Sequence, residues 1–170
     1  AGAGLSEKDV KLVLLQHADG RTALERGDVE AWAGLDPIMA SAEVESGARL
    51  FYRKAEDNTW GVLNAREDFA RDYPEIVKRV LATYEKARLW SLANPKELSK
   101  SLVDATKLSE AVIAKQLERT ELTHGPIGAA QADTIIAAGL ALQDAGVVKT
   151  DVDIKGVVKA LIDPSYLPAR

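Results

Sequence analysis

The sequence contains no cysteine, only one methionine and few aromatic residues. Without cysteine the chain holds no disulfide framework, no thiolate metal site and no cysteine nucleophile. This absence fits an oxidising compartment as well as a reducing one. No stretch approaches the roughly 18 apolar residues that cross a bilayer. No run of Lys and Arg dominates any region, so the sequence gives no reason to expect nucleic acid as a partner.

What is present is typical of a soluble globular protein. The 170 residues are 46% hydrophobic and 28% charged, with a formal net charge of -4. At about 150 residues per domain, this length corresponds to one domain or slightly more. Alanine is abundant, which favours closely packed helices. The composition therefore indicates a folded domain and does not by itself indicate a function.

The beginning of the chain is glycine-rich and lacks an initiator methionine. Residues 1–5 resemble the end of a helix that passes through a glycine turn into a strand. There is no basic segment followed by an apolar one, as a secretory signal would have. We therefore predict that an upstream portion of the natural protein precedes this sequence.

The first third of the chain alternates between two patterns. Short apolar or alternating runs predict buried strands at 10–16, 29–34, 49–52 and 59–63. Between them, helical spacing predicts helices over 21–26 and 38–46. Each of these ends at a glycine, and Asp36-Pro37 is a favourable start for the second. Strands alternating with helices favour an α/β fold with a short mixed sheet.

The remainder of the chain is predicted to be almost entirely helical. Apolar residues recur three or four positions apart, and Pro, Ser or Asp stands at several helix starts. The predicted helices cover 66–72, 74–92, 96–105, 109–119, 129–145 and 153–162. Four strands followed by a helical tail are incomplete as an independent α/β fold, which agrees with a missing upstream portion.

One segment resembles a known family. Residues 19–37 read DGRTALERGDVEAWAGLDP, and similar segments occur in the extracytoplasmic solute-binding proteins of ABC importers for aliphatic sulfonates, taurine and nitrate. Residues 72–75, 131–133 and 146–167 also resemble parts of that family, in the same order. Glu30 departs from the more common Asp but keeps the carboxylate. The resemblance covers essentially the whole chain and corresponds to the C-terminal half of such a protein.

The resemblance implies a two-lobed fold of the type II periplasmic-binding class, with a ligand cleft between the lobes. Residues 1–57 would be the remainder of the second lobe, and residues 58–170 a crossing strand followed by a helical return to the first lobe. The upstream half would be absent. The implied partners are a small anionic solute, the membrane permease and the missing half. The implied location is periplasmic or extracytoplasmic, and no cofactor is expected.

Two predicted helix starts are candidates for anion binding. Unpaired N–H groups and the positive end of the helix dipole favour negative charge at such positions. Asp19 and Gly20 precede the first, and Gly20 would let a ligand approach the backbone. Asp36 precedes the second. Either aspartate could contact an amine such as that of taurine, or could simply cap its helix.

Two tryptophans complete the predicted ligand-binding set. Trp32 lies on a predicted strand that leads to the cleft, and Trp60 on the predicted crossing strand. An indole offers an apolar face for an alkyl chain and one N–H donor for a polar head, although a strand Trp is more often packed in a core. His17 and His124 are far apart, so no metal site is predicted. Arg21 and Arg49 are possible anion partners but are better explained as solvated residues.

Three functions share this fold, and fold alone does not separate them. The first is capture of a small anion for an ABC importer, without covalent chemistry. The second is an enzyme resembling desulfinases or pyrimidine-synthesis proteins, which requires a nucleophile or an acid–base set. None stands out in this sequence, so we do not predict an enzyme. The third is an effector-sensing regulatory domain.

Overall fold

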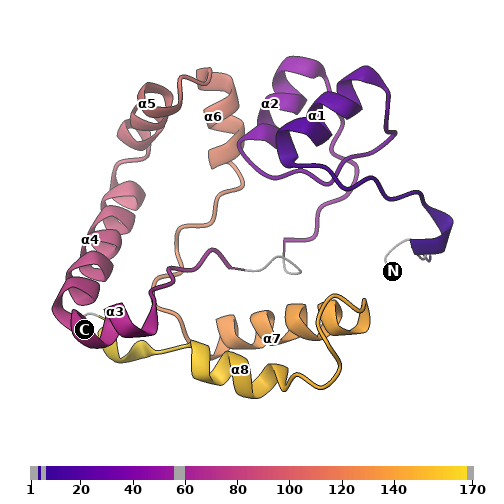
Figure 1. The fold of residues 1–170 in the computed structure, drawn as a ribbon. Helices are drawn as coiled ribbons and strands as arrows, with labels where there is room; N and C mark the ends of the chain where they lie inside the picture. The colour runs from indigo at the N-terminus through magenta and orange to yellow at the C-terminus, as the bar shows by residue number, and fades with distance from the viewer. Residues whose placement is uncertain (1–3, 5–6, 56–59, 168–170) are drawn as a thin grey trace. The chain divides into compact units, whose positions relative to one another are not determined.

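The computed structural model describes Gly4, residues 7–55 and residues 60–167, and these form helices joined by extended or irregular segments (Figure 1). The expected glycine turn at residues 1–5 lies largely outside the described residues. Asn58 and Thr59 also lie outside them. The chain divides into two compact units. The first unit contains residues 1–51 and 99–120, and the second contains residues 52–98 and 121–170.

The first unit is built from three helices, α1 (His17–Arg26), α2 (Ile38–Ser46) and α6 (Glu110–Leu117), after a short 3-10 turn η1 (Glu7–Asp9). Helix α2 covers the predicted residues 38–46, but its N-cap is Pro37, whereas the sequence predicted Asp36 at the N-cap and Pro37 as the first helical residue. Helices α1 and α2 end at Gly27 and Gly47, whose φ values of 77° and 68° are left-handed and suit glycine. Ser109 begins α6, because its side chain accepts a hydrogen bond from the Val112 N–H.

Small side chains allow α2 to approach both of its neighbours in the first unit. Helix α2 packs against α1 on one side and α6 on another. The buried apolar residues at these contacts are mostly alanines, joined by two β-branched residues from α6: Ala23, Ala40, Ala42, Val112 and Ile113. Several of the many alanines in the sequence thus lie where these three helices pack together.

The second unit contains α3 (Glu67–Asp72) and the long helix α4 (Pro74–Ala93), which are separated only by Tyr73. Pro74 occupies the first position of α4, where a missing backbone N–H costs nothing. Helix α4 packs against α3 and against the short 3-10 turn η3 (Pro164–Tyr166). Helix α5 (Pro95–Thr106) follows directly and crosses the boundary between the two units.

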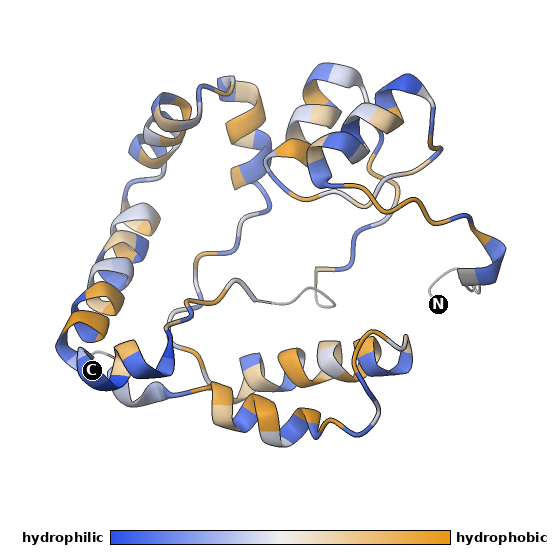
Figure 2. Cartoon of the chain, viewed as in Figure 1, coloured by the Kyte–Doolittle hydropathy of each residue, from blue (hydrophilic) through white to orange (hydrophobic). Residues whose placement is uncertain are grey.

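The remaining pair of helices in the second unit is α7 (Ala129–Asp144) and α8 (Ile154–Leu161). The two helices pack together, and Figure 2 shows hydrophobic residues on both. Ile154 and Val158 of α8 are buried. A Cβ atom added at Gly139 of α7 would lie 2.7 Å from Cγ2 of Ile154, so glycine permits this close contact.

The prediction of a short mixed sheet is wrong, because no described residue lies in a strand. Residues 10–16, 29–34, 49–52 and 60–63 form extended or irregular chain instead. Val, Ile and aromatic residues favour strands because their side chains pack well on a half-buried, pleated surface. A strand also needs a neighbouring strand whose backbone supplies hydrogen-bond donors and acceptors. Residues 10–15 make no backbone hydrogen bond to another described residue. The helix-rich C-terminal region agrees with the prediction.

The segment before α1 contains several hydrophobic residues, which Figure 2 colours orange, and their side chains are exposed. Leu14 keeps 92% of its surface accessible and Leu12 keeps 62%. Single exposed apolar residues are ordinary on protein surfaces, but a continuous run is not. The apolar residues of segment 10–16, which the sequence predicted to be buried, are therefore not buried by other parts of this chain.

Candidate functional site

Asp19 lies in the first turn of α1, which begins at His17 and not after Gly20 as the sequence predicted. Its carboxylate therefore occupies the position near the helix N-terminus that favours negative charge. An open hollow of about 310 Å³ lies beside it. The hollow is lined by apolar, hydroxyl and charged residues of α1 and of the segments on either side: Val13, Leu15, Asp19, Thr22, Ala23, Arg26, Asp28 and Val29.

Gly20 and Trp32 lie against each other, so the structure brings together two of the predicted site residues. A Cβ atom added at Gly20 would lie 2.5 Å from the indole Nε1 of Trp32. One added at Gly34 would lie 2.6 Å from Cη2 of the same ring. The indole thus covers the Gly20 backbone, in the space that the sequence assigned to a ligand. Gly20 is buried, whereas Trp32 is half-buried.

Asp36 has several partners at the start of α2. Its Oδ1 accepts a hydrogen bond from the Ala40 N–H at 3.0 Å, which supports the capping role. Arg119 donates to both carboxylate oxygens, at 2.7 Å and 2.9 Å, in a bidentate ion pair. An oxygen of Glu43 lies 2.6 Å from the same guanidinium. The three side chains therefore form one cluster that joins α2 to the end of α6.

The Asp36–Glu43–Arg119 cluster is largely shielded from water. Arg119 keeps 9% of its side chain exposed, and Asp36 and Glu43 keep 19% and 16%. Hydrogen bonding to Asp36 raises the pKa of the Arg119 guanidinium and, with a further contribution from Glu43, outweighs the opposing effect of burial, so the cation stays charged. One cation faces two carboxylates here. Through the bond from Ala40 to Asp36, the cluster also holds the first turn of α2.

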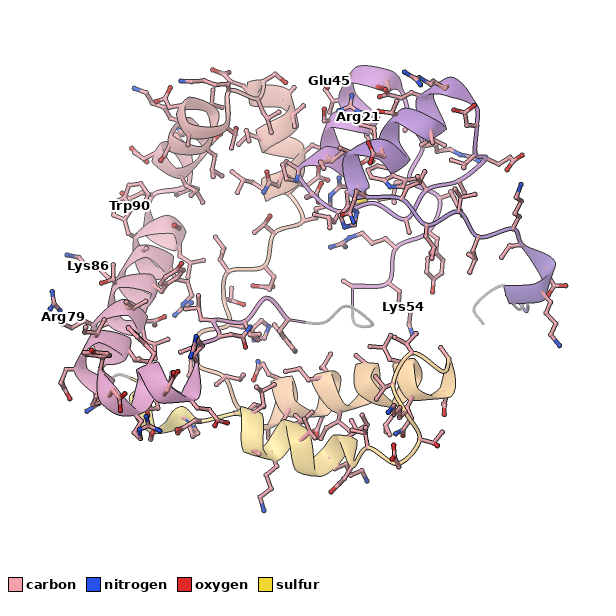
Figure 3. The ribbon with its side chains drawn as sticks, viewed as in Figure 1. Arg21, Glu45, Lys54, Arg79, Lys86 and Trp90 are labelled. Atoms are coloured by element: carbon pink, nitrogen blue, oxygen red, sulfur yellow. The ribbon has the colours of Figure 1, made fainter. Side chains whose placement is uncertain are left out.

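Arg21, predicted to be a solvated residue or an anion partner, instead links α1 to α2 (Figure 3). Its guanidinium donates to Glu25 at 2.7 Å, to Ser41 Oγ at 2.5 Å and to Glu45 at 3.1 Å. Ser41 also donates to Glu45. Hydrogen bonds from Ser41 and Arg21 lower the pKa of Glu45. Arg21 is therefore committed to internal carboxylates, which leaves it poorly placed to receive a solute.

Trp60 belongs to the second unit, where it packs edge-on against His124 with ring centroids 4.7 Å apart. Its indole N–H is buried and has no hydrogen-bond partner among the described residues. A buried donor without a partner is uncommon and costs free energy. The contact with His124 was missed by sequence reasoning, because nothing local relates two residues so far apart in the chain.

The loop that carries His124 is held by α4. Arg88 donates to the backbone carbonyls of Leu122 and Thr123, at 2.8 Å and 3.2 Å. The same guanidinium pairs with Glu85 at 2.7 Å. Two carbonyls that would otherwise lack partners are therefore satisfied by a side chain, which places His124 beside Trp60.

The residues that the structure describes contain neither a cluster suited to a metal ion nor a helix suited to a membrane. Within them, no group of three or more His, Cys, Asp or Glu side chains is arranged to hold a metal ion. Over the same ranges, none of the helices combines the length and apolar character that crossing a bilayer requires.

Two curated proteins are similar to this chain, and the names of both describe candidate aliphatic sulfonates-binding proteins. The protein from Bacillus subtilis (strain 168) is 26% identical over 161 residues, which are 94% of this chain and 47% of that protein. The protein from Escherichia coli (strain K12) is 30% identical over 129 residues, which are 75% of this chain and 40% of that protein. No family model matches, and no solved structure gives a significant match.

These similarities confirm the family that the sequence resembled. The chain is related to the aliphatic sulfonate-binding proteins of the ABC solute-binding family. It spans about half the length of the Bacillus subtilis relative and less of the Escherichia coli one. Four of the five predicted site residues, Asp19, Gly20, Trp32 and Asp36, lie in the first unit, and Trp60 lies in the second.

Proposed function

We propose that this chain is part of the solute-binding component of an ABC importer. The complete component captures a small anion, such as an alkanesulfonate, taurine or nitrate, in a cleft between lobes. It then delivers the solute to a membrane permease from an extracytoplasmic compartment. In this proposal the chain forms one part of the cleft, and the remaining half of the same protein forms the other.

One observation carries the proposal: the two similar proteins align with 94% and 75% of this chain, and both are named for binding aliphatic sulfonates. An alignment of that extent relates nearly the whole chain to the relatives, so it does not rest on a short motif. Both relatives are named as binding proteins, which supports binding without covalent chemistry. The identity of the solute, an alkanesulfonate, taurine or nitrate, is likewise proposed.

The side chains of the predicted site suit such a solute. Trp32 offers an apolar surface to an alkyl chain, with its position fixed by Gly20 and Gly34. The unpartnered N–H of Trp60 can donate to an oxygen of a sulfonate or nitrate. Asp36, already bonded to Arg119, acts by fixing the start of α2. Asp19 is available on the rim of the hollow for an amine such as that of taurine.

Calorimetric titration of the protein that includes both halves tests this function. Taurine, methanesulfonate, ethanesulfonate, nitrate and bicarbonate form the panel. We expect micromolar or tighter binding of at least one of them, and recovery of that solute chemically unchanged. Absence of binding across the panel, or conversion of the solute, would contradict the proposal.

A pair of tryptophan substitutions tests whether the indole N–H of Trp60 binds the solute. Trp60→Phe removes the indole N–H but keeps an aromatic ring beside His124. We expect about tenfold weaker binding, which corresponds to one lost hydrogen bond of about 1.4 kcal/mol. Trp90→Phe, on α4, is the matched control and should leave solute affinity unchanged. Equal effects of the two substitutions would exclude a specific role for Trp60.

A further inference from the structure

The segment before α1 concentrates exposed apolar side chains. Lys11 is the single charged residue between positions 10 and 15, and the others are all large and apolar: Val10, Leu12, Val13, Leu14 and Leu15. Among the described residues, Leu14 is the most exposed large apolar side chain. Single exposed apolar residues are ordinary, whereas a contiguous apolar surface marks a place that another body covers.

The two sides of this segment have different surroundings. Val13 and Leu15 line the hollow beside α1, and each keeps about half of its surface exposed. Leu12 and Leu14 do not line that hollow and are more exposed. Successive side chains of an extended chain point to opposite sides, which explains this alternation and places Val10 with Leu12 and Leu14. We call Val10, Leu12 and Leu14 the outer stripe.

The backbone of the same segment also lacks partners. Residues 10–15 make no backbone hydrogen bond to another described residue. Exposed apolar residues on the helices differ in this respect, because a residue such as Leu89 of α4 has its backbone groups bonded within its own helix. Water serves the backbone of residues 10–15 while it is exposed, but a body that covers it must supply hydrogen-bonding groups. The segment therefore requires a partner with both apolar and hydrogen-bonding groups.

The relatives contain enough additional chain to cover this segment. The regions similar to this chain make up 47% of the Bacillus subtilis protein and 40% of the Escherichia coli protein. More than half of each relative therefore lies outside the region that this chain matches. A further part of the same polypeptide is also held near the segment by the covalent chain, at a high effective concentration.

We propose that the outer stripe is the surface through which this chain packs against the remaining part of the same protein. This inference rests on the proposed function, in which that remaining part exists and completes the cleft. The remaining part presents apolar side chains to Leu12 and Leu14 and hydrogen-bonding groups to the backbone beside them. Because the outer stripe does not line the hollow beside Asp19, it joins the two parts of the protein and does not contact the solute.

A second copy of the chain is the other body that could cover the outer stripe, and the size of the stripe argues against it. A stable interface between separate proteins buries roughly 800 Å² on each partner. Three aliphatic side chains fall well short of that area. Within one polypeptide a smaller surface is sufficient, because its two sides do not have to find each other in solution.

Thiol accessibility in the complete protein tests the inference. This chain has no cysteine, so Leu14→Cys introduces one reactive thiol, and any cysteine of the remaining part is first replaced. A water-soluble maleimide should alkylate Leu14→Cys at least about a hundredfold more slowly in the folded protein than in urea, because a covered thiol is not reached. Val147→Cys, at a residue that is 72% exposed and outside the outer stripe, is the matched control. It should react within about tenfold of its rate in urea. Leu12→Cys replaces Leu14→Cys if circular dichroism shows that the latter is unfolded.

Dilution identifies the body that covers the thiol. Protection of Leu14→Cys that persists over a hundredfold dilution supports a contact within one polypeptide. Protection that disappears on dilution overturns the inference in favour of a second copy. Equal protection factors at positions 14 and 147 overturn it as well, because the outer stripe would then not be a specific contact.

Calorimetric titration of the complete protein with the solute panel separates this inference from the proposed function. Solute binding together with a freely reactive thiol at position 14 overturns the inference and leaves the proposed function intact. Absence of solute binding together with a protected thiol contradicts the proposed function and still supports the outer stripe as the contact between the two parts.

Discussion

The two units of this chain differ in the contacts that stabilise each of them internally. In the first, α1, α2 and α6 meet through buried alanines and two β-branched residues, and ion clusters centred on Arg21 and Arg119 join the helices. In the second, α7 and α8 pack through Ile154 and Val158, while the long helix α4 has no buried residue. The first unit is fixed by polar contacts over a small core, and the second by pairwise helix contacts.

This difference affects how rigidly each unit can hold the side chains of a binding site. Side chains held by several partners keep their geometry, which is what a preorganised site requires. Asp36 meets this condition through Arg119 and Ala40. Trp60, in the second unit, has a ring contact but an unpartnered N–H. We therefore expect the first unit to contribute a rigid part of the site and Trp60 to acquire its partner when solute binds.

The largest expected effect comes from removing the shielded cation of the first unit. Arg119→Met leaves Asp36 and Glu43 without their counterion, and should lower the free energy of unfolding by about 3 kcal/mol. Urea unfolding followed by circular dichroism measures the change. Arg66→Met is the control: Arg66 pairs with Asp68 but keeps 83% of its side chain exposed, so we expect a change within about 0.5 kcal/mol.

Neutralising the carboxylates sharpens this prediction. Adding Asp36→Asn and Glu43→Gln to Arg119→Met removes the charges that were left without a partner. Part of the lost stability should then return, since an uncompensated shielded charge costs more than a neutral polar group. If Arg119→Met and Arg66→Met destabilise the chain equally, the account of the first unit is wrong.

A smaller effect is expected where an indole packs on a glycine. Gly20→Ala would place a Cβ 2.5 Å from Nε1 of Trp32, so the ring must move. Overpacking costs about 1–3 kcal/mol, and the better helix propensity of alanine offsets about 1 kcal/mol of it. A net loss of about 1 kcal/mol and a shift in tryptophan fluorescence should follow. Gly61→Ala, in open space, should leave both unchanged.

The smallest expected effect is on stability at acidic pH. Hydrogen bonds from Ser46 and Arg21 lower the pKa of Glu25, and those from Ser41 and Arg21 lower the pKa of Glu45. The folded chain therefore binds these protons more weakly than the unfolded chain, whose glutamates titrate near 4.5. Their stabilising contribution is complete above that pH and is lost as pH falls through the lower folded pKa values.

Thermal unfolding at a series of pH values between about 5 and 3 measures this contribution. The Tm should fall with pH, and the variant with Glu25→Gln and Glu45→Gln should show a shallower fall than the parent. An identical slope in the two proteins would mean that the Arg21 network does not contribute to acid sensitivity.

The sequence predicted most helices because their ends carry local signals. Asp36-Pro37 and Gly47 flank α2, and Pro74 begins α4, so residues next to the helix ends indicated where these helices lie. The start of α1 was placed too late, because Gly20 was interpreted as a break. It is a helical residue that must be small because Trp32 covers it.

The errors concern features that depend on residues far apart in the chain. The run at residues 10–16 encodes a preference for burial, but no local signal says which backbone will pair with it, and none does among the described residues. The partners of Asp36 and Trp60, Arg119 and His124, were likewise beyond local patterns. The contact of the five site residues with a solute is still a prediction.

The measurement that most directly tests the central claim is calorimetric titration of ethanesulfonate into two samples, this 170-residue chain and the protein with its remaining half. In the proposed function the chain supplies only part of the cleft, so we predict micromolar binding by the longer protein and binding weaker than about millimolar by the chain alone. Submillimolar binding by the chain alone would contradict the shared cleft. Absence of ethanesulfonate binding by the longer protein would contradict the assignment of a sulfonate as its solute.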